Sequence, residues 1–214
     1  MIPLQCFSFA GNTENSVVDF TNLLENHDDC NVEIIVGEEP NVKAFKAHKF
    51  ILTDRSTYFK NALSPQWASV ENGIIKFKKP NISPSIFEVL FKYIYTGAIS
   101  VGNNSLVDIA IASDELQLLE VYQYLEGCLL EDESVWNSRD VITILQYDSF
   151  VKLYSAAIKL ACKNPEAIFN SEYFIRMKET YLINLLKCDY LELDEIEIWE
   201  YLIRWGIENT NSIL

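Results

Sequence analysis

The sequence predicts an α+β domain followed by an all-α domain, and two observations lead to this prediction. As far as residue 130, short β-branched runs alternate with helical patterns, whereas beyond it only helical spacing recurs. The acidic segment LLEDESVWNSRD at 129–140 separates the two patterns and is the best candidate for a domain boundary. We therefore expect an irregular N-terminus at 1–15, an α+β domain at 16–130 and a helical domain at 131–214.

The α+β part is expected to open with a short amphipathic helix. Val17, Phe20 and Leu24 follow helical spacing between Ser16 and His27. An apolar stripe on such an isolated helix has no core of its own to enter, so a partner subunit is the natural place for it. The pattern predicts a helix that takes part in dimerisation.

Three short segments of the first half have the composition of β-strands. VEIIVG at Val32–Gly37 is β-branched and ends on a turn residue, and VKAF at Val42–Phe45 follows it after a polar turn. GIIKFKK at Gly73–Lys79 alternates apolar residues with lysines, which is typical of a strand with one solvent-exposed face. We expect a hairpin and a third strand.

Helices are expected in the remaining segments, and several have recognisable ends. Ser56 is placed as the N-cap of a helix that Pro65 terminates, and Ser83-Pro84 opens another that ends at Gly97. The predicted helical segments are AHKFILTD, RSTYFKNALS, one from Pro84 with Ile86, Leu90 and Ile94 on one stripe, Leu106–Ala112, one with Val121 to Leu129 in register, Val151–Cys162 up to the break at Asn164-Pro165, one around Leu182 to Leu186, and a last one, capped by Asp194, with Ile196, Trp199, Leu202 and Ile203 on its buried face.

The composition excludes several classes of function. The chain has 214 residues, 49% of them hydrophobic, and a formal net charge of -14, so it can bury a core but lacks the basic surface that nucleic acids or anionic membranes require. No segment has the length and apolar character of a membrane span or a secretory signal. The five cysteines are widely spaced and indicate free thiols in a reducing compartment. We expect a soluble intracellular protein of the cytoplasm, with the nucleus as the alternative location.

Few residues have the character of a catalytic or ligand-binding site. His48, at the start of an apolar helix, is interpreted as a buried, hydrogen-bonded histidine, and no nucleophile elbow or phosphate-binding glycine loop is present. The lysine cluster at 76, 78 and 79 is interpreted as the solvated face of its strand. The sequence thus predicts a non-enzymatic protein with no catalytic residues, no cofactor and no metal.

Three segments, taken in order, resemble the BTB/POZ family. They are VKAFKAHKFILTDRSTYFKNAL, ISPSIFEVLFKYIYTGAISV at 82–101 and IASDELQLLEVYQYLEGCL at 111–129. The segment FIRMKETYLINLLKCDYLELDEIEIWEYLIRWG at 174–206 looks like a BACK domain. The resemblance implies a BTB dimer with a helical BACK domain, and a role as an adaptor that brings other proteins together.

The resemblance also implies where two copies of the chain would meet. The interface is expected to involve the N-terminal helix and the start of the helix after the hairpin, with Asn31 beside Lys49. The family usually has Asp at the position of Asn31, and an amide retains the hydrogen bond but lacks the charge. The expected interface residues are Val17, Phe20, Leu24, Asn31, Lys49 and Phe50.

A second surface is implied for adaptors of ubiquitin ligases built on the third cullin. Such adaptors commonly carry a large apolar residue and, two residues later, Glu in the loop after the YF helix. Here Trp67 occupies the apolar position and Ser69 stands in place of Glu, with Leu63 preceding the loop. We expect Trp67 to lie exposed between Leu63 and Gly73. The alternative is that it folds back onto its own helix.

Three hypotheses about function follow. The first is a homodimeric adaptor that recruits an unknown client protein to a cullin-RING ubiquitin ligase. The second is a dimerising scaffold with no link to a ligase. The third, an enzyme such as a thiol hydrolase, has the least support because a catalytic thiol needs a base within hydrogen-bonding reach.

Overall fold

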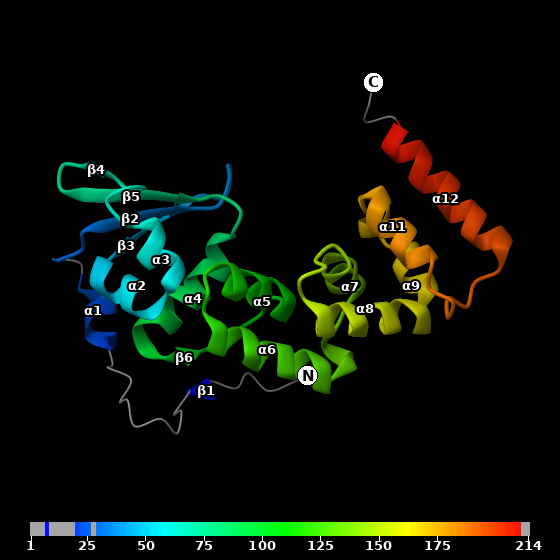
Figure 1. Ribbon diagram of the computed structural model, residues 1–214, viewed down its shortest axis with the longest axis horizontal. Coiled ribbons are helices and arrows are strands. Elements are labelled where there is room, and N and C mark those ends of the chain that lie inside the picture. Colours follow the sequence, from blue (N-terminus) through cyan, green and yellow to red (C-terminus); the bar gives the residue numbers. More distant parts are fainter. Residues whose placement is uncertain (1–6, 9–19, 27–28, 211–214) are drawn as a thin grey trace. The chain divides into compact units, whose positions relative to one another are not determined.

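The computed structural model describes residues 7–8, 20–26 and 29–210 (Figure 1). The chain divides into two compact units, 1–125 and 126–214, and each is described by itself. The division falls inside helix α6 (Leu119–Glu131). The domain ranges 1–15, 16–130 and 131–214 remain a prediction.

The first unit contains a mixed sheet in which the described strands follow the order β3-β2-β5-β4. The predicted hairpin is confirmed as β2 (Val32–Val36) and β3 (Lys43–Ala47), which pair antiparallel. The predicted third strand is β5 (Ile74–Lys79), and it lies parallel to β2. The edge strand β4 (Ser69–Glu71) was expected to be loop; it pairs antiparallel with β5. A second pairing joins β1 (Phe7–Ser8) to β6 (Ala98–Ile99).

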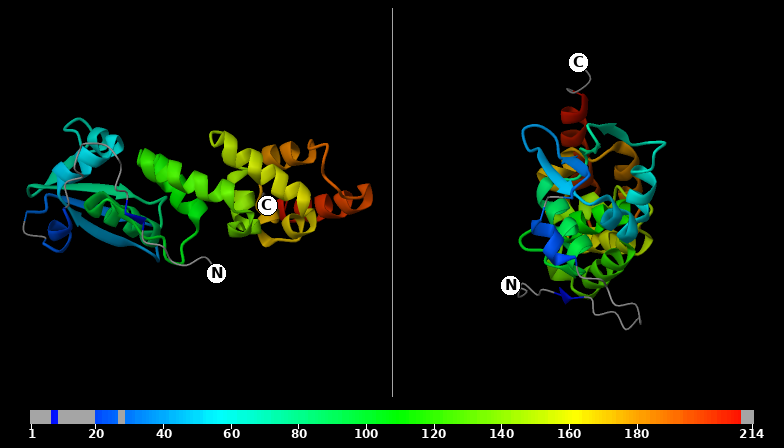
Figure 2. Two further views of the ribbon diagram at one scale, coloured as in Figure 1. Left: turned by 90° about the horizontal axis from the view of Figure 1, so that it is seen from below. Right: turned by 90° about the vertical axis from the view of Figure 1, so that its left-hand side faces the viewer.

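One face of this sheet packs against helices, as the ribbon views indicate (Figures 1 and 2). Val32, Ile34 and Val36 of β2 alternate along the strand and are all buried. The ring of Phe45 on β3 lies 4.9 Å from the ring of Phe87 on α4, measured between centroids. The core of the unit therefore lies between the sheet and these helices.

Two helices of the first unit, α3 and α4, have the boundaries that the sequence predicts. Ser56 caps α3 by accepting a hydrogen bond from the Phe59 N–H, as expected. Ser83 and Pro84 open α4, and Gly97 ends it in the left-handed conformation with φ of 71°. The helices are α1 (Thr21–Glu25), α2 (Lys49–Arg55), α3 (Thr57–Ala62), α4 (Pro84–Thr96), α5 (Leu106–Glu115) and α6.

The predicted helix from Ser16 to His27 is found only in part. Phe20 is its N-terminal cap residue and the helix α1 begins at Thr21. Residues Ser16 to Asp19, with Val17 among them, and His27 lie outside the described residues.

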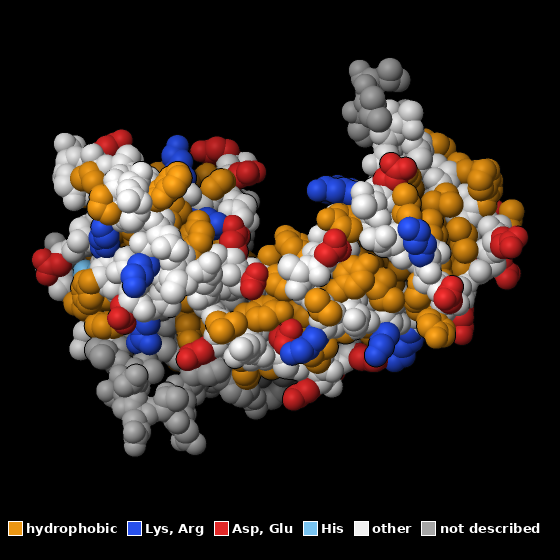
Figure 3. All heavy atoms as spheres, viewed as in Figure 1, with side chains coloured by type: hydrophobic (Ala, Val, Ile, Leu, Met, Phe, Trp, Pro, Cys, Tyr) orange, Lys and Arg blue, Asp and Glu red, His pale blue; other side chains and the backbone are white. Residues whose placement is uncertain are grey.

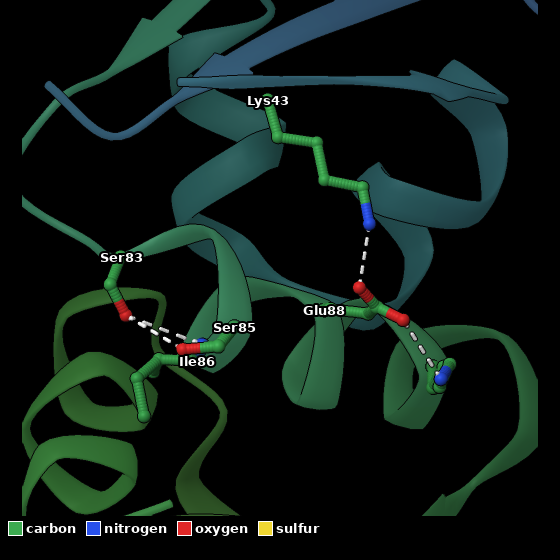
Figure 4. A network of polar contacts seen from close by, with 6 residues as sticks. Lys43, Ser83, Ser85, Ile86 and Glu88 are labelled. Atoms are coloured by element: carbon green, nitrogen blue, oxygen red, sulfur yellow. Dashed lines mark hydrogen bonds and ion pairs between the residues drawn. The ribbon is translucent and has the colours of Figure 1, made fainter. Parts of the chain in front are cut away.

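A polar link also holds α4 to the sheet. The ammonium of Lys43 on β3 donates to Glu88 on α4 over 2.6 Å, and Lys92 approaches the other carboxylate oxygen at 3.0 Å (Figure 4). These two hydrogen bonds hold the pKa of Glu88 below its usual range, and the bond from Lys43 has the larger effect. At the start of the same helix, the Ser83 hydroxyl oxygen caps α4 by accepting a hydrogen bond from the Ile86 N–H.

The interpretation of Lys79 as part of a solvated lysine face was wrong. In β5, residues two apart share a face, so Lys79 lies on the same side as Ile75 and the helices, whereas Lys76 and Lys78 lie on the other. Lys79 is 6% exposed. Its ammonium is paired with the carboxylate of Glu115 on α5. Buried charge is tolerated here because it is paired.

The second unit is helical in its described part. The predicted connector at 129–140 is itself largely helical, since α6 continues to Glu131, a 3₁₀ turn η1 follows at Glu133–Val135 and α7 begins at Ser138. The predicted break at Asn164-Pro165 is confirmed: α8 ends at Lys163, and a further helix, α9, begins at Pro165. The remaining helices are α7 (Ser138–Ile144), α8 (Val151–Lys163), α9 (Pro165–Phe169), α10 (Glu172–Ile175), α11 (Glu179–Leu186) and α12 (Glu195–Thr210).

Helix α12 packs with the opposite face to the one predicted. Trp205 donates its indole N–H to the Met177 carbonyl over 2.8 Å, and the ring of Tyr201 lies 5.1 Å from that of Phe169. The predicted buried face is largely exposed: Ile196, Trp199 and Ile203 are each between 45% and 64% exposed, and Leu202 is half-buried. Figure 3 shows hydrophobic side chains gathered over this helix.

Candidate functional site

The only described histidine is part of the core. His48 is 2% exposed; its backbone N–H donates to the hydroxyl oxygen of Tyr95 over 3.0 Å, and its Nδ1 lies 3.0 Å from the same oxygen. The expectation of a buried, hydrogen-bonded histidine is confirmed. Burial is the main reason that the pKa of Tyr95 rises to about 12.

A thiol lies beside this histidine, but its environment does not activate it. The Sγ of Cys30 is 3.9 Å from Nδ1 of His48 and 4.0 Å from Nε2. Burial raises the pKa of the Cys30 thiol, with Lys46 acting in the opposite direction. A nucleophilic cysteine requires a lowered pKa. The hypothesis of a thiol hydrolase therefore gains no support from this contact.

The described residues contain neither a metal-ligand cluster nor a membrane-spanning helix. Within them, no group of three or more His, Cys, Asp or Glu side chains converges as metal ligands would. In the same part of the chain, no helix combines the length and apolar character needed to cross a bilayer.

The first candidate surface centres on Phe50, at the second residue of α2. Its side chain is 53% exposed, and its ring meets the half-buried Phe20 ring edge-on with centroids 5.7 Å apart. The guanidinium of Arg55 lies over Phe20, 5.9 Å from its centroid. Leu24 is half-buried on α1. We call Phe20, Leu24 and Phe50 the α1–α2 face.

Asn31 and Lys49 meet beside this face, although through other atoms than expected. The Lys49 backbone N–H, rather than its ammonium, donates to Oδ1 of Asn31 over 2.8 Å. The first backbone N–H groups of a helix have no acceptor within the helix. The uncharged side chain of Asn31 supplies such an acceptor to the backbone N–H of Lys49, the first residue of α2. The backbone of Asn31 is also fixed between β3 and β5, through Ala47 and Ile75.

The second surface lies between α3 and β4. Trp67 is 81% exposed in a turn that Ser64 closes, its carbonyl accepting from the Trp67 and Ala68 amides. The expectation of an exposed Trp67 is confirmed, and the alternative of a ring folded onto its own helix is wrong. Leu63 is fully buried and therefore cannot contact a partner as predicted. Ser69 is exposed but belongs to strand β4 rather than to the loop.

The fold and these surfaces define a protein-interaction module, and comparison with known proteins gives its family. The family model described as BTB/POZ domain matches residues 20–133, and the one described as BTB And C-terminal Kelch, abbreviated BACK, matches residues 141–213. The first match covers more than half of the chain. The chain therefore belongs to the BTB/POZ family, and its two domains make it a protein of the BTB–BACK adaptor type.

The names of curated relatives refer to kelch repeats, to the BTB domain or to both. Human Kelch repeat and BTB domain-containing protein 4 is 24% identical over 161 residues, which cover 73% of this chain and 30% of that protein. Mouse Kelch-like protein 28 is 28% identical over 177 residues, covering 80% of this chain and 29% of that protein. The chain thus spans less than a third of the length of these relatives.

Among solved structures, the BTB domain of zebrafish PATZ1 is similar to part of this chain. It is 21% identical with a TM-score of 0.43, and the match covers 53% of this chain and 86% of that one.

Proposed function

We propose that this protein is a non-enzymatic adaptor that forms a homodimer through the α1–α2 face. The observation that carries the proposal is Phe50, a large aromatic residue that is 53% exposed and edge-on to Phe20. Aromatic side chains are enriched in the cores of protein interfaces, and a few of them supply most of the binding energy. A twofold dimer would place the same face of both copies together.

The site of dimerisation is tested by light scattering on the full chain and two variants. Phe50→Asp puts a charge into the proposed contact; loss of such an anchor costs at least about 2 kcal/mol, or roughly thirtyfold in dissociation constant. Val151→Asp is the matched control, because Val151 is 71% exposed but lies in the second unit. We expect only Phe50→Asp to lower the measured mass from that of two chains towards that of a single chain. Equal masses for both variants would contradict the proposed face.

We further propose that the dimer recruits a client protein to a cullin-RING ubiquitin ligase through Trp67. Its exposure supports this contact, because an apolar anchor has to be accessible to enter a partner's pocket. Ser69 cannot supply the charged hydrogen-bond acceptor of a Glu, which is worth roughly 1.5–3 kcal/mol. Binding is therefore expected to be about ten- to a hundredfold weaker than with Glu at this position. The alternative is a dimerising scaffold without a ligase.

Calorimetry against the N-terminal part of the third cullin separates these two functions. We expect measurable binding by the wild type, loss of binding in Trp67→Ala and a gain in Ser69→Glu. Trp199→Ala is the matched control, since Trp199 is 61% exposed on α12 and should leave binding unchanged. If the wild type does not bind and Ser69→Glu creates no binding, the scaffold function takes the place of the ligase function.

A further inference from the structure

Two cysteines of the second unit lie in direct contact. The Sγ of Cys162, in the last turn of α8, is 2.8 Å from the Sγ of Cys188, which follows α11. A disulfide requires about 2.05 Å between sulfurs, so an approach of under about 1 Å would suffice for bond formation. The two residues are 26 apart in the chain and share none of the close spacing by which paired thiols are recognised in a sequence.

The backbone on both sides keeps this pair together. Cys162 lies within a regular helix and is 8% exposed. Cys188 is fixed in a turn, because its N–H donates to Leu185 over 3.1 Å and its carbonyl accepts from Leu191 over 3.2 Å. Leu185, one turn earlier, is itself buried. The contact is therefore set by the packing of the unit rather than by two free side chains.

The two thiols differ in their access to solvent. Burial, followed by the contact with Cys188, raises the pKa of Cys162 to about 12, so this sulfur is the poorer initial nucleophile while Cys188 is still a thiol. Cys188 is half-buried and is the more exposed of the two. A reagent arriving from solvent reaches Cys188 first.

We propose that Cys162 and Cys188 form a site of reversible oxidation, at which a small-molecule disulfide such as oxidised glutathione converts the two thiols into an intramolecular disulfide. In the first step Cys188 loses its proton and its sulfur attacks the reagent, which forms a mixed disulfide and releases one glutathione. In the second step Cys162 loses its proton and attacks the sulfur of Cys188, which breaks the mixed disulfide and releases the second glutathione. Two electrons and two protons leave the protein for the two glutathione molecules.

The new bond would fix the end of α11 to α8 within the second unit. It closes a loop of 26 residues in the unfolded chain and thereby lowers the entropy of unfolding. For a unit of this size, the expected rise in unfolding midpoint is on the order of 10 °C. In a reducing compartment such a bond is transient, which is typical of regulatory rather than structural disulfides.

The test is oxidation of the folded full chain by glutathione disulfide, followed by alkylation of the remaining thiols and mass spectrometry. The chain has five cysteines, and two of them should become protected from alkylation. After trypsin digestion, the segments 160–163 and 188–204 should be found joined. Dithiothreitol should separate them and reverse the rise in the unfolding midpoint.

Three variants assign the roles. In Cys162→Ser the reaction should stop at a glutathione adduct on Cys188. In Cys188→Ser the thiol of Cys162 should remain open to alkylation. Cys128→Ser is the matched control, because Cys128 is a half-buried free thiol on α6, and this variant should form the bond normally. The proposal is overturned if every thiol of the folded chain stays open to alkylation. It is equally overturned if the wild type stops at the mixed disulfide, or if the bond found joins any other pair.

Discussion

Removing one partner of the ion pair between Lys79 and Glu115 is expected to destabilise the first unit strongly, because the other charge would be left buried without a counterion. Lys79 is 6% exposed, whereas the side chain of Glu115 is 33% exposed. The ammonium also donates to the Tyr58 hydroxyl over 3.1 Å, and Asn81 donates to both carboxylate oxygens of Glu115 at 2.8 Å each. Glu115→Gln would remove the negative charge and leave the buried ammonium without its counterion.

The cost of that change can be bounded from the burial of the pair. Removing one partner of a fully buried pair costs about 3–5 kcal/mol. Because solvent reaches part of Glu115 and the neutral amide keeps some hydrogen bonds, we expect about 2–3 kcal/mol. The matched control is Glu88→Gln in the same unit, whose partner Lys43 has a side chain 50% exposed. An exposed pair of this kind contributes about 1 kcal/mol or less.

Urea denaturation, followed by circular dichroism, measures both variants against the wild type. The slope of the transition should be unchanged while the midpoint of Glu115→Gln falls. A double variant Lys79→Met, Glu115→Gln should recover stability, since no buried charge remains. If Glu115→Gln costs no more than Glu88→Gln, the buried ion pair does not stabilise the unit in the way its geometry indicates.

Two other predictions concern the core and the last helix. Because burial raises the pKa of Tyr95 from 10 to about 12, the folded form keeps a proton that the unfolded form loses, so stability should fall between these pH values by roughly 1.4 kcal/mol per pH unit. Urea titrations from pH 8 to alkaline pH test this, and Tyr95→Phe should show a shallower fall; an identical pH profile would refute it. On α12, Ile203→Asp should change the unfolding free energy by no more than about 0.5 kcal/mol, whereas Trp205→Ala should cost at least about 1 kcal/mol. If thermal melts show a larger loss of stability for Ile203→Asp than for Trp205→Ala, α12 packs with the face that carries Ile203.

Much of the fold could be predicted because the signals are local. The strand at Val32–Val36 has β-branched residues between clear turns, and the caps at Ser56 and Ser83 act within a single helical turn. Strand β4 was missed because it has only three residues, too few for alternation to be distinguished from chance. Lys79 was misassigned because three lysines close together were treated as one face, although the period of a strand separates Lys79 from the other two.

The errors at α12 and at the interaction surfaces have a tertiary origin. The helix has apolar residues on two sides, and periodicity alone does not state whether the stripe with Ile203 or that with Trp205 meets the core. Asn31 and Lys49 were correctly placed together, but only the structure shows that the bond reaches the backbone amide. The contact of Cys162 with Cys188 depends on how α8 and α11 pack, which no local pattern encodes.

The proposal that this BTB–BACK chain acts as a dimer is tested most directly by its mass in solution. Sedimentation equilibrium of the untagged full chain over a range of micromolar concentrations gives that mass without assuming a shape. We predict the mass of two chains, with dissociation only on strong dilution, because the α1–α2 face leaves Phe50 exposed in each copy. The mass of a single chain throughout the micromolar range would contradict the account.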